Sequence, residues 1–105
     1  MYKDGKLIPV DTEEILYVTV EGRDVVIFAK QDNFRLSITL NEIQKKLDSK
    51  KFVKTHRSFI VNLEHIEEII PWFNNTYMLK IRGKNIQIPV SRSNVKRFKE
   101  IMGII

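Results

Sequence analysis

The middle of the chain carries three consecutive polar residues, His56, Arg57 and Ser58, which offer several hydrogen-bond donors side by side. Two aromatic residues, Phe52 and Phe59, flank them and can anchor the segment in a core. Arginine donates paired hydrogen bonds to phosphates and to base edges, and imidazole and hydroxyl groups can add further contacts. These residue types in this order are suited to holding a phosphate or the edge of a base.

The segment 52–63 is expected to begin as a polar, basic loop and to become an apolar strand after Ser58. Its second half alternates with a period of two, which is typical of a half-buried strand. Arg57 has the same parity as Phe59, so a straight strand would point its charge into the core at a high cost in free energy. We therefore expect the chain to bend near Thr55 to Arg57 and to hold its charges at a mouth or edge of the β-structure.

A second group of polar residues opens the expected C-terminal helix. Ser91 is a natural N-cap, and the run 91–94 offers N–H groups and hydroxyls that can hold a phosphate. A docked helix with a solvated basic face explains the same residues equally well. At helical spacing the apolar stripe comprises Val95, Phe98 and Met102, and the cationic face comprises Arg92, Lys96 and Lys99.

Other cations are weaker candidates. Arg23 follows Gly22 at the tip of an expected hairpin, where a solvated charge that keeps the turn soluble is the plainer interpretation. Lys54 precedes the central polar group and, with Lys50 and Lys51, can add nonspecific attraction to phosphates.

Catalytic and metal-dependent chemistry receive little support from the residue types. The chain has no cysteine and two histidines, so it offers no disulfide or thiolate, and we expect no metal site. His56 beside Ser58 lacks an orienting acid, and adjacent Glu67 and Glu68 would point to opposite faces of a strand. No glycine-rich phosphate loop is present. We expect no catalytic residues, no cofactor and no enzyme activity.

The elements that must position these groups are mostly short strands. β-Branched and aromatic runs bounded by polar turns predict eight to ten strands, a middle helix and a C-terminal helix. Thr39 and Glu42 form a capping box that opens the middle helix, and Gly103 ends the last one. The expected strands and turns are a ribbon over 1–8, a helical turn over 11–14, strands 15–21, 24–29, 34–38 and 59–63, a hairpin of 66–73 with 76–82, and a strand 86–90.

Two features near these strands have structural interpretations. Asn62 is expected to fix the following turn through a local bond from its side chain to the backbone. Trp72 and Phe73 flank the tip of the 66–82 hairpin, where aromatic residues can stack on bases. We expect them instead to be core or cross-strand partners.

Composition is compatible with a single domain spanning residues 1–105. The hydrophobic fraction of 43% suffices for a core, while 30% charged residues, no long apolar run and no signal peptide indicate a cytoplasmic protein. The net charge of +5 by itself fits an ordinary soluble surface. The clustering of the cations shifts the interpretation toward nucleic acid.

The central stretch also carries a resemblance to a known family. A phenylalanine, three residues, His-Arg-Ser, an aromatic residue and Ile-Val-Asn-Leu, over 52–63, resemble the signature of the LytTR family of bacterial DNA-binding domains, commonly attached to response-regulator receivers. This match is specific because it is long and mixes polar with apolar positions. Other segments follow the family's order along the whole chain: Ile15-Leu16-Tyr17-Val18, Leu40-Asn41-Glu42-Ile43, Ile66 to Ile69 and Pro89-Val90-Ser91-Arg92.

The resemblance implies a mainly β fold, an elongated stack of small antiparallel β-sheets with one middle helix and a C-terminal helix. It also implies that loops, rather than a recognition helix, enter successive major grooves on one side of a bent duplex. Folding must then gather three clusters on one edge: Arg23; His56 to Ser58; and Arg92, Ser93 and Lys96.

The expected contacts are of two chemical kinds, base contacts by arginine and phosphate contacts by lysine. Arg57, together with Arg23 or Arg92, is expected to read guanine through its O6 and N7 acceptors. Phosphate contacts are expected from Lys54, Lys96 and Lys99. His56 either contacts DNA or braces Arg57, and the sequence leaves both roles open.

The same resemblance implies that the chain acts as a sequence-specific transcription regulator of a bacterial two-component system. Its expected partner is double-stranded DNA with direct repeats, without membrane association. An isolated domain is expected to be monomeric and to pair on DNA. The chain is either part of a longer regulator with a receiver or sensor domain, or a naturally short regulator.

Two other functions stay open. A protein-interaction or membrane-proximal β-domain could use the same basic edge for an acidic partner. An RNA-binding β-domain could stack bases on Trp72, Phe73 or Tyr77. A preference for duplex DNA with direct repeats would support the DNA-binding hypothesis over the protein-interaction and RNA-binding alternatives. A hydrolase ranks a distant fourth.

Overall fold

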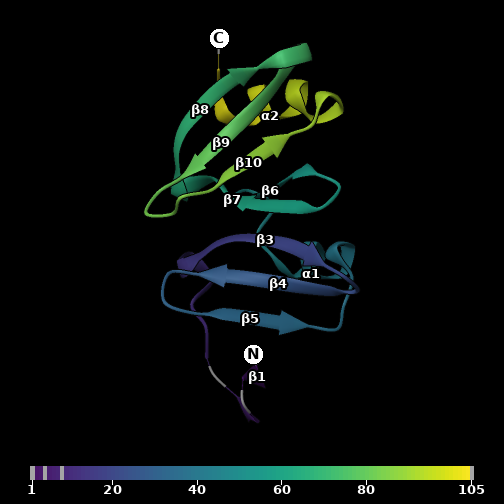
Figure 1. Ribbon diagram of the computed structural model, residues 1–105, viewed down its shortest axis with the longest axis vertical. Helices are drawn as coiled ribbons and strands as arrows, with labels where there is room; N and C mark the ends of the chain where they lie inside the picture. The colour runs from purple at the N-terminus through teal and green to yellow at the C-terminus, as the bar shows by residue number, and fades with distance from the viewer. Residues whose placement is uncertain (1, 4, 8, 105) are drawn as a thin grey trace.

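A computed structural model describes residues 2–3, 5–7 and 9–104 of the chain. Its elements closely follow the polar turns of the sequence (Figure 1). The strands are Tyr2–Lys3 (β1), Lys6–Leu7 (β2), Ile15–Glu21 (β3), Asp24–Ala29 (β4), Asn33–Leu36 (β5), Phe52–His56 (β6), Phe59–Asn62 (β7), Ile66–Trp72 (β8), Thr76–Ile81 (β9) and Gln87–Val90 (β10). The helices are Leu40–Lys46 (α1) and Val95–Met102 (α2), and the 3-10 turns are Thr12–Glu14 (η1), Leu63–His65 (η2), Phe73–Asn75 (η3) and Arg92–Asn94 (η4).

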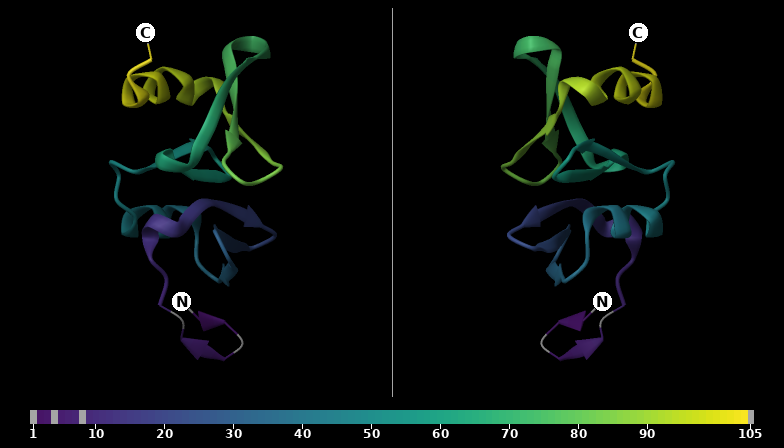
Figure 2. Two further views of the ribbon diagram at one scale, coloured as in Figure 1. Left: turned by 90° about the vertical axis from the view of Figure 1, so that its left-hand side faces the viewer. Right: turned by 90° about the vertical axis from the view of Figure 1, so that its right-hand side faces the viewer.

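The strands form three antiparallel sheets stacked along the long axis of the molecule, which measures 45 × 25 × 24 Å. The largest sheet has the order β5-β4-β3-β7-β6, the second has the order β10-β9-β8, and β1 and β2 form a small ribbon. Figures 1 and 2 show this arrangement, with α1 beside the five-stranded sheet and α2 beside the three-stranded one. The predicted elongated, mainly β architecture with two helices is confirmed. Of the predicted ribbon, Met1, Asp4 and Ile8 lie outside the described residues.

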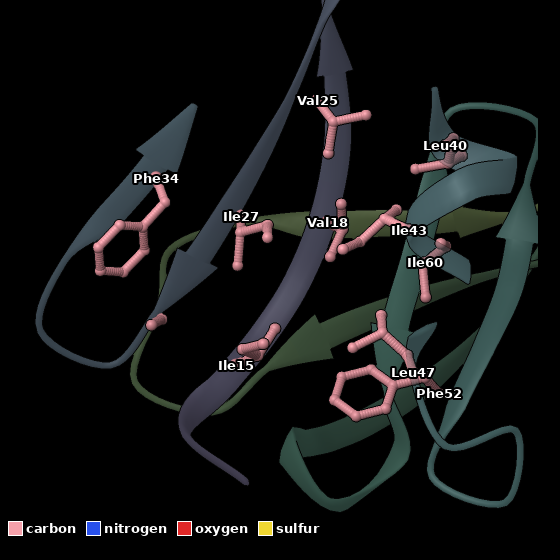
Figure 3. Close-up of a cluster of buried hydrophobic side chains, with 11 residues drawn as sticks. Ile15, Val18, Val25, Ile27, Phe34, Leu40, Ile43, Leu47, Phe52 and Ile60 are labelled. Atoms are coloured by element: carbon pink, nitrogen blue, oxygen red, sulfur yellow. The ribbon is translucent and has the colours of Figure 1, made fainter. Parts of the chain in front are cut away.

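The five-stranded sheet separates two hydrophobic cores. On one face Ile60 packs with Ile15, Val18 and the side chains of α1 (Figure 3). On the other face Val61 packs with the three-stranded sheet and with Phe98 of α2. The prediction that β7 is half-buried is therefore wrong, because adjacent residues of this central strand face different cores.

Residues 52–56 form a strand, so the expected loop is also a wrong prediction. Phe52, Val53 and Thr55 are buried because β6 pairs with β7 along one side and lies close to β10 and η4 on the other. The bend itself is found at Arg57 and Ser58, between these two strands, and Arg57 is exposed there as predicted.

Local signals at the helices and turns are confirmed. The Thr39 side chain accepts the Glu42 N–H at 3.1 Å and the Glu42 carboxylate accepts the Thr39 N–H, which completes the capping box. Gly103 ends α2 with a φ of 67°. The Asn62 side chain accepts the Glu64 N–H at 3.0 Å, and it also donates to the Ile15 carbonyl at 2.8 Å. This second bond ties the turn to β3.

The aromatic residues at the tip of the β8–β9 hairpin are not core residues. Trp72 is 49% exposed and Phe73 is 75% exposed, so the core alternative is wrong for both, whereas the cross-strand alternative holds for Trp72. Trp72 does pair in register with Thr76, so its backbone belongs to the sheet while its ring faces solvent in part. None of the described helices is long and apolar enough to cross a membrane.

Candidate nucleic-acid interface

The turn between β6 and β7 is held by two hydrogen bonds that leave its cation exposed. The Ser58 N–H donates to Nδ1 of His56 at 3.1 Å. The Ser58 carbonyl accepts the hydroxyl of Thr19, on the neighbouring strand β3, at 3.0 Å. His56 also packs edge-to-face on Phe59 with ring centroids 5.8 Å apart. Arg57 therefore stands at the apex of a fixed turn.

The start of the C-terminal segment lies directly against this turn. The Ser91 N–H donates to the Thr55 carbonyl at 2.8 Å, which fastens the end of β10 to β6. Between the two segments is an open cleft of about 410 Å³. Its lining residues carry two cations and no carboxylate: Lys54, His56, Arg57, Ser91, Ser93 and Asn94. Residues more than thirty positions apart in the sequence thus form one polar, cationic surface.

The first turn of the C-terminal segment differs from its expected form. Ser91 precedes η4, and α2 begins only at Val95, so Ser91 is not the N-cap of the long helix. The Ser91 side chain caps no backbone N–H and instead accepts the Asn94 Nδ2 donor at 2.6 Å. Arg92 and Ser93 are exposed on the resulting tight turn.

The lysines differ in how far they are fixed. Lys54 is half-buried, and its Nζ donates to the Asn41 side chain of α1 at 2.9 Å, so its charge is oriented without being neutralised. Arg92, Lys96 and Lys99 are exposed, and none of them makes an ion pair within the described residues. These three do not line the cleft but continue the cationic surface along η4 and α2.

Arg23 is outside the cleft but at the same end of the five-stranded sheet. Thr19 pairs with Phe59, so the tip of the β3–β4 hairpin and the β6–β7 turn project in the same direction. Figure 1 shows the β3–β4 tip, the β6–β7 turn and η4 one above another on the right-hand edge. The structure thus arranges the three predicted clusters in a row along one edge.

The carboxylates at the β3–β4 tip are already engaged. Arg35 of β5 contacts Asp24 at 3.1 Å and Glu21 at 3.8 Å. Arg23 is exposed and makes no ion pair with any described residue. Arg35 therefore offsets the acidic charge of the tip and leaves Arg23 as its free cation.

Several residues of this edge were missed by reasoning from the sequence. Asn41 and Thr19 orient the predicted residues through the bonds described above, and Arg35 neutralises the tip. Thr19 and Arg35 act across strands, so no local pattern marks them. Asn94 belongs to the polar run 91–94 that was predicted to hold a phosphate, and its bond to Ser91 was not foreseen.

The chain is similar to known proteins in both sequence and structure. Residues 5–103 match the model of the LytTr DNA-binding domain. The sensory transduction protein LytT of Enterococcus faecalis is 46% identical over 101 residues, which cover 96% of this chain and 41% of that protein. The transcriptional regulatory protein YpdB of Escherichia coli K12 is 35% identical over 102 residues, 97% of this chain and 42% of that protein.

A solved structure agrees with these sequence matches. The LytTr DNA-binding domain of a putative methyl-accepting/DNA response regulator from Bacillus cereus superposes with a TM-score of 0.88 at 27% identity. The superposition covers 98% of this chain and 94% of that domain. The chain spans about two fifths of the curated relatives it matches. By its fold, and by a match along nearly its whole length, the chain belongs to the LytTr DNA-binding domain family.

Proposed function

We propose that this chain binds double-stranded DNA in a sequence-specific manner as the DNA-binding part of a bacterial transcription regulator. The observation that carries the proposal is the row of three cation-bearing turns along one edge, with the β6–β7 turn and η4 sharing a cleft that no described carboxylate lines. Turns that project from a rigid sheet suit insertion into the grooves of a duplex. Membership of the family and the names of the relatives support the same conclusion.

Base reading and phosphate contact are assigned to different side chains. Arg57 stands on the braced turn and reads guanine through O6 and N7 in the major groove, which is worth roughly 1–3 kcal/mol of discrimination. Arg23 and Arg92 are the base-reading candidates of the neighbouring turns. Lys54, Lys96 and Lys99 contact phosphates, with Ser58 and Ser93 adding hydroxyl contacts.

The length of the relatives supports a partner domain in addition to DNA. The matched relatives are more than twice as long as the match itself, so a receiver or sensor domain in a longer chain supplies the regulation. The isolated domain is monomeric and pairs on direct repeats, so that each copy presents one edge to the duplex. The protein acts in the cytoplasm and is not an enzyme.

A randomised-site selection followed by binding in a salt series tests this function. Wild type is expected to select a defined duplex, with affinity that falls steeply as salt rises. Arg57→Ala is expected to lower affinity for the selected site by about 5- to 150-fold, equivalent to roughly 1–3 kcal/mol, and to relax one base position.

The matched control is Arg82→Ala, which removes an exposed arginine from the β9–β10 turn. It should bind like wild type, because that turn lies on the opposite edge (Figure 1). No enriched sequence for wild type, or a folded Arg57→Ala that behaves like wild type, would count against DNA reading through this turn.

A further inference from the structure

Two large aromatic side chains are exposed together at the tip of the β8–β9 hairpin, and the proposed DNA contacts leave them unused. Phe73 is 75% exposed and Trp72 is 49% exposed. Their rings pack edge-to-face with centroids 5.5 Å apart. Adjacent exposed aromatic residues keep apolar surface in water, which commonly marks a contact site.

The hairpin tip fixes the backbone on either side of the exposed Phe73 ring. Asn74 and Asn75 both adopt left-handed backbone, with φ of 56° and 58°, a conformation that is uncommon outside glycine. The Thr76 hydroxyl donates to the Phe73 carbonyl at 2.6 Å and closes the turn. A rigid tip loses little conformational entropy when its ring enters a contact.

A cationic cleft lies beside the tip and links it to the candidate interface. The cleft has a volume of about 300 Å³, and Trp72, Tyr77, Val95 and Lys99 are among its lining residues, none of which is acidic. Val95 directly follows η4, so the tip and the third cationic cluster are neighbours. Figure 2 shows the hairpin tip and α2 at the same end of the molecule.

We propose that the Trp72–Phe73 tip packs against the duplex flanking the recognised site, with Phe73 as an apolar wedge in the minor groove and Lys99 on the adjacent phosphate. This inference rests on the proposed DNA-binding function and extends the interface beyond η4. Apolar side chains at a minor groove pack on sugars and base edges and favour a bend in the duplex. Such a wedge at one end of the protein would stabilise a bent site.

Area and charge favour DNA over a protein partner at this tip. The two exposed rings offer on the order of a few hundred Å², well below the roughly 800 Å² that each partner contributes to a stable protein interface. A protein surface would also have to desolvate Lys99 beside the rings. A duplex supplies phosphates for Lys99 and apolar sugar faces for Phe73 in one contact.

Two duplexes that share the selected core site distinguish the contribution of the tip to affinity from that of the rest of the interface. One ends at the core, and the other extends on both sides by about one helical turn, roughly 10 base pairs. Phe73→Ala is expected to lose about 5- to 30-fold in affinity for the long duplex and less than about twofold for the short one. Phe73→Tyr should restore binding because it keeps the ring.

The single tryptophan, Trp72, provides a direct optical signal. Its emission should be quenched by the long duplex and unchanged by the short one, with each variant compared with its own free form. Ile101→Ala is the matched control, since it removes an apolar side chain that is 41% exposed on α2 and does not line the cleft. It should bind both duplexes like wild type.

The outcomes distinguish the two proposals. Equal losses on both duplexes, a Phe73→Ala variant that binds the long duplex like wild type, or unchanged Trp72 emission would overturn the tip contact while DNA binding stands. Selective quenching by single-stranded RNA, or self-association that Phe73→Ala abolishes in sedimentation, would also overturn it. If wild type binds no duplex, both proposals fail.

Discussion

At the scale of single residues, His56 holds the β6–β7 turn, and we propose that it also contacts DNA, the other role that the sequence left open. Its Nδ1 accepts the Ser58 N–H and so holds the β6–β7 turn, which leaves Nε2–H as a donor. An asparagine at this position places its Oδ1 near the former Nδ1, so it can keep the brace without the second nitrogen.

His56→Asn and His56→Ala therefore separate bracing from contact. We expect His56→Asn to lose only the ring contact with Phe59 from its stability, so that it unfolds at a slightly lower urea concentration than wild type. It should lose about fivefold in affinity, the worth of one hydrogen bond of roughly 1 kcal/mol. His56→Ala should lose stability by roughly 1 kcal/mol and affinity by more than His56→Asn. Urea titration and duplex binding measure the two effects. If His56→Asn binds the duplex with wild-type affinity, His56 holds the turn but does not contact DNA.

Much of the local chemistry at this scale could be read from the sequence, and the long-range contacts could not. Arg57 was expected to be exposed at a bend because its parity would otherwise bury a charge, and it is exposed. The bonds that fix the site join Thr19 to Ser58 and Asn41 to Lys54, pairs that lie 39 and 13 residues apart. No local spacing specifies such pairs, because the first depends on strand register and the second on how α1 packs beside β6.

At the scale of elements, prediction worked where polar turns interrupt strands and failed where a strand is buried on both faces. The hairpins and the capping box carry their own signals, so β3 and β4 match their expected limits and α1 begins where it was expected. β6 was missed because its lysine and histidine conceal a strand that gains its burial from β7 and η4. The Trp72–Phe73 tip was expected to hold core or cross-strand partners because aromatic residues usually are one or the other, and the cross-strand pairing of Trp72 is the part that is found.

The link between β6 and η4 gives a prediction for the whole C-terminal element. Ser91 has φ of −65° and ψ of 154°, so proline fits its backbone but removes the N–H that donates to the Thr55 carbonyl. Ser91→Pro is expected to lower the free energy of unfolding by roughly 1–3 kcal/mol. It should also cut DNA affinity at least about tenfold, because η4 shifts away from the β6–β7 turn.

Ser91→Ala is the control for this element, because it keeps the N–H and removes only the hydroxyl that accepts from Asn94. Chemical denaturation and binding to the selected duplex report the two effects. If Ser91→Pro and Ser91→Ala bind equally well, the fixed spacing of η4 and the β6–β7 turn is not required for recognition.

At the scale of the whole molecule, cations occupy two opposite edges. One edge carries the β3–β4 tip, the β6–β7 turn and η4, and the other carries the β4–β5 and β9–β10 turns (Figure 1). Lys30, Arg82 and Lys84 on this second edge line a cleft of about 420 Å³ together with Glu64 and His65. The net charge of +5 alone would let either edge attract DNA.

The salt dependence of binding shows whether the net charge of the protein attracts DNA or whether one defined edge binds it. Lys96→Ala and Lys84→Ala each lower the net charge by one, so any effect of overall charge is the same in both. If the first edge binds the duplex, Lys96→Ala reduces the slope of log affinity against log salt by roughly 0.9, the worth of one released counterion, whereas Lys84→Ala leaves it at the wild-type value. Fluorescence anisotropy over a salt series measures both slopes. Equal reductions would mean that the duplex senses the net charge rather than one edge, and the assignment of phosphate contacts to α2 would then be wrong.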